Sequence, residues 1–147
     1  MGKLGKFFEI DNLAYQYDPS NPNRLLGVKD FTANEAGFRD DDAHSQNDYT
    51  YDADGNMTAD NNKGISAITY NHMNLPTHIH LENGDIYFTY DALGNKWDKF
   101  VDGDEGEKGT AYRFGFQYDF DYLGDVIYNE KLMFFPTGQG YVSTIYS

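Results

Sequence analysis

Cysteine is absent from this chain of 147 residues. Its absence excludes disulfides, thiolate nucleophiles and cysteine-ligated zinc sites. Long apolar runs are missing as well. The first ten residues lack the apolar stretch of about 7–15 residues that a signal peptide carries, and no segment approaches the roughly 20 apolar residues of a membrane-spanning helix. We therefore expect no membrane insertion and no signal peptide in this chain.

Basic residues are scarce. Eleven Lys and Arg stand against 24 Asp and Glu, which gives a formal net charge of −13. A chain of this charge repels phosphate backbones, so nucleic acid is not expected as a partner. No serine-centred elbow or phosphate-cradling loop is present, and the acidic residues are too many to single out one catalytic pair. We expect no enzymatic activity, no catalytic residue and no cofactor.

Aromatic residues and glycine are abundant instead. The chain holds 13 Tyr, 11 Phe and one Trp, together with 15 Gly. This mixture favours strands and tight turns over helices. The length suits one domain with its own core. The composition therefore predicts a single all-β domain over residues 1–147.

A unit of about 20 residues recurs three times, which is typical of a repeat architecture. The central tyrosines lie at positions 51, 70 and 90, and each is followed by Asp or Asn and then, three residues later, by Gly or Asn. The defining residues are Tyr49, Tyr51, Asp52, Gly55 and Asn56 in the first unit, Tyr70, Asn71 and Asn74 in the second, and Tyr90, Asp91, Gly94 and Asn95 in the third.

Each unit predicts the same local structure. The Asp or Asn side chain can accept a hydrogen bond from the backbone two residues on, and Gly or Asn three positions later tolerates the left-handed conformation. We expect a type I turn followed by a bulge. The tyrosines pack their rings along the sheet and are expected to keep their hydroxyls in water.

The segment between the second and third units predicts a β-hairpin. Residues 77–82 and 85–90 flank Asn83-Gly84, a strong signal for a two-residue turn. In the expected register Glu82 lies opposite Asp85, and Leu81 lies opposite Ile86. Alternate residues then form one dry face, while the other face carries His80 opposite Tyr87.

Three regions follow from these patterns. Residues 33–48 form an acidic, solvated loop, residues 49–100 hold the clearest repeats, and residues 110–146 hold aromatic strands, with strict alternation from Tyr112 to Tyr122. We predict meandering β-hairpins in a twisted sheet or a partial β-shell or spiral. Such a fragment exposes strand edges, which predicts self-association through edge strands.

Two groups of residues are candidates for metal binding. Asp52 and Asp54 begin an alternation of oxygen ligands that imitates a calcium loop, but Met57 stands where the invariant Gly belongs. His78 and His80 share a strand face with Glu82, a spacing that suits zinc if a fourth group approaches. Ordinary repeat turns and exposed strand histidines account for both groups, so we expect no resident metal.

Exposed aromatic side chains raise a further alternative. Tyrosine and tryptophan faces can stack on the rings of sugars, and Tyr87, Trp97 and Tyr112 are the candidates for glycan stacking. The competing interpretation places these aromatics in the packing ladder of the repeat. A glycan-binding module on the same fold is therefore kept as the alternative function.

The segments 49–56, 68–76 and 87–96 resemble the YD-repeat proteins of the Rhs class, especially the large Bacteroidetes-type forms. The stretch 122–142 also resembles the segment that precedes the Rhs-associated core domain of those proteins. The resemblance covers about residues 8–146. It implies a strand-turn-strand ribbon that spirals into a hollow shell, in proteins that are secreted or displayed on the cell surface and that enclose a toxin or contact other cells.

Two departures from the family limit what the resemblance implies. The chain lacks the autoproteolytic core motif, and no variable toxin domain follows Ser147. Cargo and cleavage are therefore not expected. The expected function is that of a structural or interaction module, a fragment of an Rhs-type shell whose partner is a second copy of the chain or the remainder of a larger Rhs protein.

Overall fold

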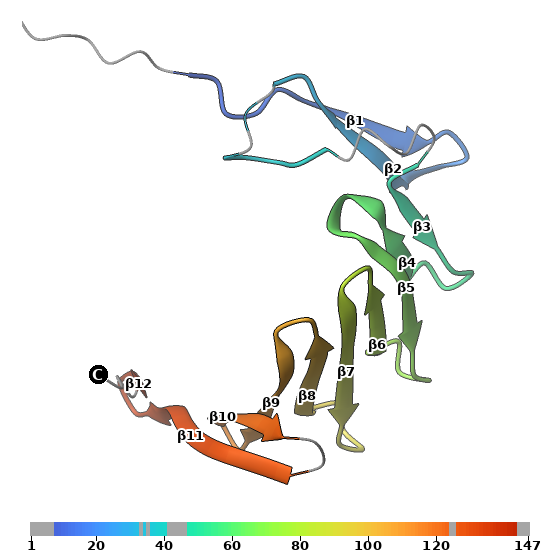
Figure 1. The fold of residues 1–147 in the computed structure, drawn as a ribbon. Helices are drawn as coiled ribbons and strands as arrows, with labels where there is room; N and C mark the ends of the chain where they lie inside the picture. The colour runs from blue at the N-terminus through green and yellow to red at the C-terminus, as the bar shows by residue number, and fades with distance from the viewer. Residues whose placement is uncertain (1–7, 33, 35, 41–46, 124–125, 144–147) are drawn as a thin grey trace, which may run out of the picture. The chain divides into compact units, whose positions relative to one another are not determined.

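A computed structural model describes residues 8–32, 34, 36–40, 47–123 and 126–143, and it consists almost wholly of antiparallel β-strands (Figure 1). The predicted all-β fold of meandering hairpins is confirmed. By contacts the chain divides into two compact units, residues 1–64 and 65–147. The single domain stays a prediction.

The first unit contains two hairpins and a short 3-10 turn. Its elements are β1 (Leu13–Asp18), β2 (Asn21–Asp30), β3 (Tyr49–Tyr51), β4 (Met57–Asp60) and η1 (Asn61–Lys63). Strand β1 pairs with β2, and β3 pairs with β4, both antiparallel.

A buried carboxylate connects β2 with the start of β3. Asp48, the last residue of the predicted acidic loop, is buried, and its Oδ2 accepts a 2.6 Å hydrogen bond from the backbone N–H of Val28. The backbone N–H of Asp48 also donates to the carbonyl of Leu26 at 2.8 Å. This end of the acidic segment therefore serves packing in the first unit. Residues 33, 35 and 41–46 of the same segment lie outside the described residues.

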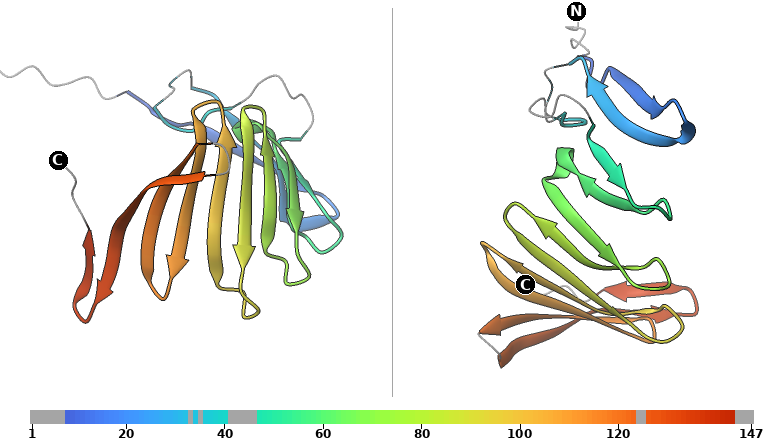
Figure 2. Two further views of the ribbon diagram at one scale, coloured as in Figure 1. Left: turned by 60° about the horizontal axis from the view of Figure 1, so that its bottom comes forward. Right: turned by 90° about the vertical axis from the view of Figure 1, so that its right-hand side faces the viewer.

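The second unit is one antiparallel meander of eight strands in sequence order (Figure 2). The strands are β5 (Ile65–Tyr70), β6 (Pro76–Leu81), β7 (Gly84–Tyr90), β8 (Lys96–Gly103), β9 (Gly106–Arg113), β10 (Phe116–Leu123), β11 (Val126–Thr137) and β12 (Gly140–Ser143). The described part of the chain holds no helix that is long and apolar enough to cross a membrane.

The three repeat turns share one backbone structure. In each, the N–H of the Gly or Asn donates to the carbonyl three residues earlier, from Gly55 to Asp52 at 3.3 Å and from Gly94 to Asp91 at 3.1 Å. The donors adopt positive φ angles, 89° at Gly55, 57° at Asn74 and 83° at Gly94. The strand register shifts at the central tyrosine of every unit. The predicted turn with its bulge is confirmed.

Side chains stabilise these turns through hydrogen bonds, as the sequence predicts, but they form two different hydrogen-bond patterns. Asp91 Oδ1 accepts backbone N–H groups two and four residues on, both at 2.9 Å, and Oδ2 accepts Asn95 Nδ2 at 2.8 Å. Asp52 and Asn56 repeat this pattern. The second repeat has a leucine, Leu75, in place of this asparagine. Asn71 Oδ1 therefore accepts the two backbone hydrogen bonds, but no bond joins the two side chains.

The hydroxyls of two repeat tyrosines are bonded to backbone. Tyr51 Oη donates to the carbonyl of Leu25 at 2.7 Å, and Tyr90 Oη donates to the carbonyl of Pro76 at 2.8 Å. Partial burial raises the pKa of both phenols. The expectation that these hydroxyls stay in water was wrong, because each hydroxyl reaches a backbone carbonyl outside its own turn.

The hairpin of β6 and β7 has a different register from the expected one. Leu81 pairs with Gly84, and the two loop residues are Glu82 and Asn83. The pairing is therefore shifted by two residues. Because side chains alternate with period two, the shift leaves every residue on its expected face but changes its partner. His80 now lies opposite Asp85 instead of Tyr87.

The two faces of the second unit carry different rows of side chains. One row across β5 to β8 is aliphatic, and the row on the opposite face is aromatic. The aliphatic row is Ile68, Ile79, Ile86 and Val101, and the aromatic row is His78, Tyr87, Phe100, Tyr122 and Phe120. Among the described apolar side chains of this unit, Ala111 alone is buried. The second unit is therefore a ribbon of hairpins with little packed core of its own.

Candidate functional site

Two histidines and a carboxylate meet on neighbouring strands. His78 and His80 lie on β6, and Asp85 lies on β7 directly opposite His80. Asp85 Oδ1 is 2.5 Å from His78 Nε2 and 2.8 Å from His80 Nδ1. The three ligand atoms all lie within 4.8 Å of one another. We call this group the His-His-Asp cluster.

The cluster is accessible to solvent at His80 and Asp85, and it packs against Tyr87 at His78. The side chain of His80 is 53% exposed and that of Asp85 is 24% exposed. The ring of His78 stacks in parallel on Tyr87, with 4.5 Å between ring centroids. Hydrogen bonds from His80 and His78 lower the pKa of Asp85, so its carboxylate is charged at neutral pH.

The sequence predicted that His78 and His80 share a site, but it predicted Glu82 in place of Asp85 as the third residue. Glu82 was expected beside the histidines, but it lies in the loop between β6 and β7 and is not part of the cluster. Asp85 was missed because the expected register placed it opposite Glu82. The signal that finds it is the alternative two-residue loop, which brings Asp85 opposite His80.

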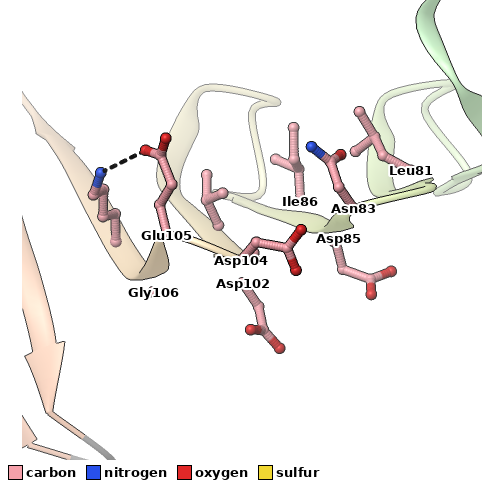
Figure 3. Close-up of a pocket in the computed structure, with 12 residues that line it drawn as sticks. Leu81, Asn83, Asp85, Ile86, Asp102, Asp104, Glu105 and Gly106 are labelled. Atoms are coloured by element: carbon pink, nitrogen blue, oxygen red, sulfur yellow. Dashed lines mark ion pairs between the residues drawn. The ribbon is translucent and has the colours of Figure 1, made fainter.

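A hollow lies at the same end of the hairpins as the cluster, and Leu81, Ile86 and Val101 of the opposite, aliphatic face are among the residues that line it. It has a volume of about 250 Å³ and lies between residues 81–86 and 101–108. Figure 3 shows the side chains of Asp85 and Asp102 pointing to the same side of the sheet. In the register Asp85 pairs with Asp102, and Asp102 pairs with Glu107. A row of carboxylates therefore extends from the cluster across three strands.

The glycan candidates separate into two places. Trp97 and Tyr112 line one pocket of about 320 Å³, together with Asp91, Asn95 and Lys96 at the third repeat turn. Tyr87 lies outside this pocket and stacks on His78. The structure therefore brings two of the three predicted aromatics together.

Cations occupy the aromatic faces around this pocket. The guanidinium of Arg113 lies 4.1 Å from the ring centroid of Trp97 and donates to Asp98 at 2.6 Å. Lys96 Nζ lies 4.5 Å from the ring of Phe88. Partial burial raises the pKa of Tyr112. The pocket is lined by aromatic rings, a carboxylate, an amide and an ammonium, which can contact and hydrogen-bond a polar ring.

The predicted calcium candidates serve the turn instead. Both carboxylate oxygens of Asp52 accept hydrogen bonds within the first repeat, from the backbone of Asp54 and from Asn56. The side-chain bond from Asn56 is the largest of the effects that lower the pKa of Asp52. Among the described residues, the group of side chains close enough together to hold a metal ion is the His-His-Asp cluster, and Asp52 and Asp54 are not part of it.

Comparison with models of known protein families, with curated proteins and with solved structures finds no match for this chain.

Proposed function

We propose that the chain is a non-enzymatic scaffold, a segment of a β-shell of the YD-repeat kind from an Rhs-type protein that is secreted or displayed on the cell surface. The observation that carries the proposal is the repetition of one turn structure at residues 52–55, 71–74 and 91–94. Repeats of this kind extend by adding units, because each unit contacts its neighbours along the chain.

The thin core supports the same proposal. A sheet normally buries one face against another layer. In the second unit both described faces keep partly exposed rows, the aliphatic and the aromatic one, and buried apolar side chains are nearly absent among the described residues. The apolar surface of such a ribbon is fully buried when further repeats or an enclosed partner cover it. Enclosure or surface display is the task that this architecture suits.

The edge of the meander offers the route of association. Strand β12 pairs with β11 on one side, and its four residues are all exposed. Tyr141 and Val142 expose 74% and 45% of their surface. An exposed edge of this kind pairs with a strand of another chain. The partner is a second copy of this chain or the remainder of a larger protein.

We predict concentration-dependent self-association that depends on β12. Light scattering coupled to size exclusion is expected to show a molar mass that rises to that of a dimer or larger species. Val142→Lys is expected to restore the monomer, because a charge on an edge strand opposes pairing. Leu93→Lys, which changes an exposed leucine in a repeat turn, is the matched control and should leave association unchanged. A monomer at every concentration would contradict the proposal.

Glycan binding is the second candidate, because Trp97 and Tyr112 line one pocket with three polar side chains. We predict that any sugar found on a glycan array binds at this pocket. Trp97→Ala should then weaken binding about fivefold, since one aromatic contact contributes about 1 kcal/mol. Tyr87→Ala removes an exposed aromatic outside the pocket and serves as the control in calorimetric titrations. No binding to any sugar, or an equal loss in both variants, removes this candidate.

A further inference from the structure

We propose that the His-His-Asp cluster binds a divalent transition metal ion, with Zn²⁺ as the type ion. His78, His80 and Asp85 would supply two imidazole nitrogens and one carboxylate oxygen. This donor set suits zinc and its neighbours among the transition metals, whereas calcium and magnesium prefer oxygen ligands alone. The inference concerns a site that the scaffold proposal does not use, and it stands independently of it.

The distances fit a metal ion after small side-chain movements. A tetrahedral zinc ion lies about 2.1 Å from each nitrogen and oxygen ligand, so two ligands are separated by about 3.4 Å. The present separations of Asp85 Oδ1 from His78 Nε2 and from His80 Nδ1 are 2.5 and 2.8 Å, and all three atoms fit within 4.8 Å. Each of the two separations therefore has to widen by less than about 1 Å.

Each imidazole directs one ring nitrogen at the carboxylate of Asp85. For both imidazoles to donate to Asp85 Oδ1, His78 carries a proton on Nε2 and His80 carries one on Nδ1. These protons occupy the positions from which each nitrogen would bind the metal. When a metal ion binds, each neutral ring carries its proton on the other ring nitrogen instead, and the metal is held by the same three atoms.

The surroundings position the ligands and favour a cation. The parallel stack with Tyr87 fixes the plane of the His78 ring. Pairing of β6 with β7 places all three ligands on one rigid ladder, and sites on paired strands are more precise than sites on loops. The neighbouring carboxylates of Asp102 and Glu107 lie in the same cross-strand row and add negative potential.

The exposure of the cluster determines the kind of site. His80 and Asp85 keep 53% and 24% of their side chains accessible, so an ion can enter from solvent and water can complete its coordination. A structural zinc site is closed by four protein ligands, whereas three protein ligands leave an open position. The geometry therefore points to a solvent-accessible ion that links β6 to β7.

The test is a Zn²⁺ titration of tag-free protein that has been stripped with a chelator, followed by competition with a chromophoric indicator. One equivalent of zinc is expected to bind. His80→Gln and Asp85→Asn should each weaken binding at least about tenfold, because loss of even an outer-shell partner costs about 10–100-fold. His72→Gln changes an exposed histidine in the second repeat turn, outside the cluster, and should leave the affinity unchanged.

Two further readouts separate a built site from an adventitious ion. Co²⁺ absorption should show the intense visible bands of a four-coordinate ion in the wild type and lose them in His80→Gln. Zinc should also raise the urea midpoint of the wild type but not of His80→Gln, because an ion that binds the folded state stabilises it. Circular dichroism checks that each variant is folded. Absence of saturable binding, or binding that His80→Gln leaves unchanged, overturns the proposal.

Discussion

Gly84→Ala is expected to lower the free energy of unfolding by at least about 3 kcal/mol. Gly84 has a φ of 145°, a conformation that is nearly restricted to glycine. A Cβ atom there would overlap the carbonyl oxygen of Asp102 on β8 and lie 2.8 Å from the Cα of Gly103. Both neighbours are backbone, so relief requires the ladder between β7 and β8 to open at its end.

Gly106→Ala separates the conformational cost from the steric one. Gly106 also has a positive φ, 100°, but a Cβ atom there meets nothing within 4 Å. This control should lose about 1–2 kcal/mol, the usual cost of a left-handed non-glycine residue. Urea unfolding followed by fluorescence of Trp97, the chain's one tryptophan, measures both variants. Equal losses would show that β7 and β8 do not approach closely at Gly84.

Acidification is expected to destabilise the folded chain through its hydrogen-bonded carboxylates. Hydrogen bonds in the folded state lower the pKa of five described aspartates, which are Asp18, Asp30, Asp52, Asp85 and Asp91. A lowered pKa contributes stability that is present above the ordinary value of 3.8 and is lost as the pH falls through the lowered pKa of each group. The urea midpoint should therefore be steady at mild acidity and fall steeply below about pH 4.

The second repeat supplies the matched control for this prediction. Its turn uses Asn71 and Leu75, which do not titrate, where the third repeat uses Asp91 and Asn95. The double variant Asp91→Asn with Asn95→Leu transplants the one turn into the other. It should fold, because the two backbone bonds to the first residue are kept, and its midpoint should fall less with acidity. An unchanged pH dependence would show that the carboxylate of Asp91 does not link stability to pH.

Local chemistry determined the turns and the class of fold. An Asp or Asn followed three residues later by Gly or Asn specifies its turn through bonds within five residues, so the sequence by itself predicts it. Alternation likewise assigns side chains to faces, as it did for Ile79 and His80. These features depend on near neighbours along the chain, and the structure confirms them at residues 52–55, 71–74 and 91–94.

Partners across strands were decided by the tertiary structure alone. A shift of two residues preserves every face, so alternation cannot distinguish the expected register from the observed one. That shift brings Asp85 to His78 and His80, and it places Gly84 against β8. The pocket of Trp97 and Tyr112 likewise depends on how separate strands align. Local sequence thus determines the structure of the repeat turns, whereas both candidate sites arise from pairing between strands.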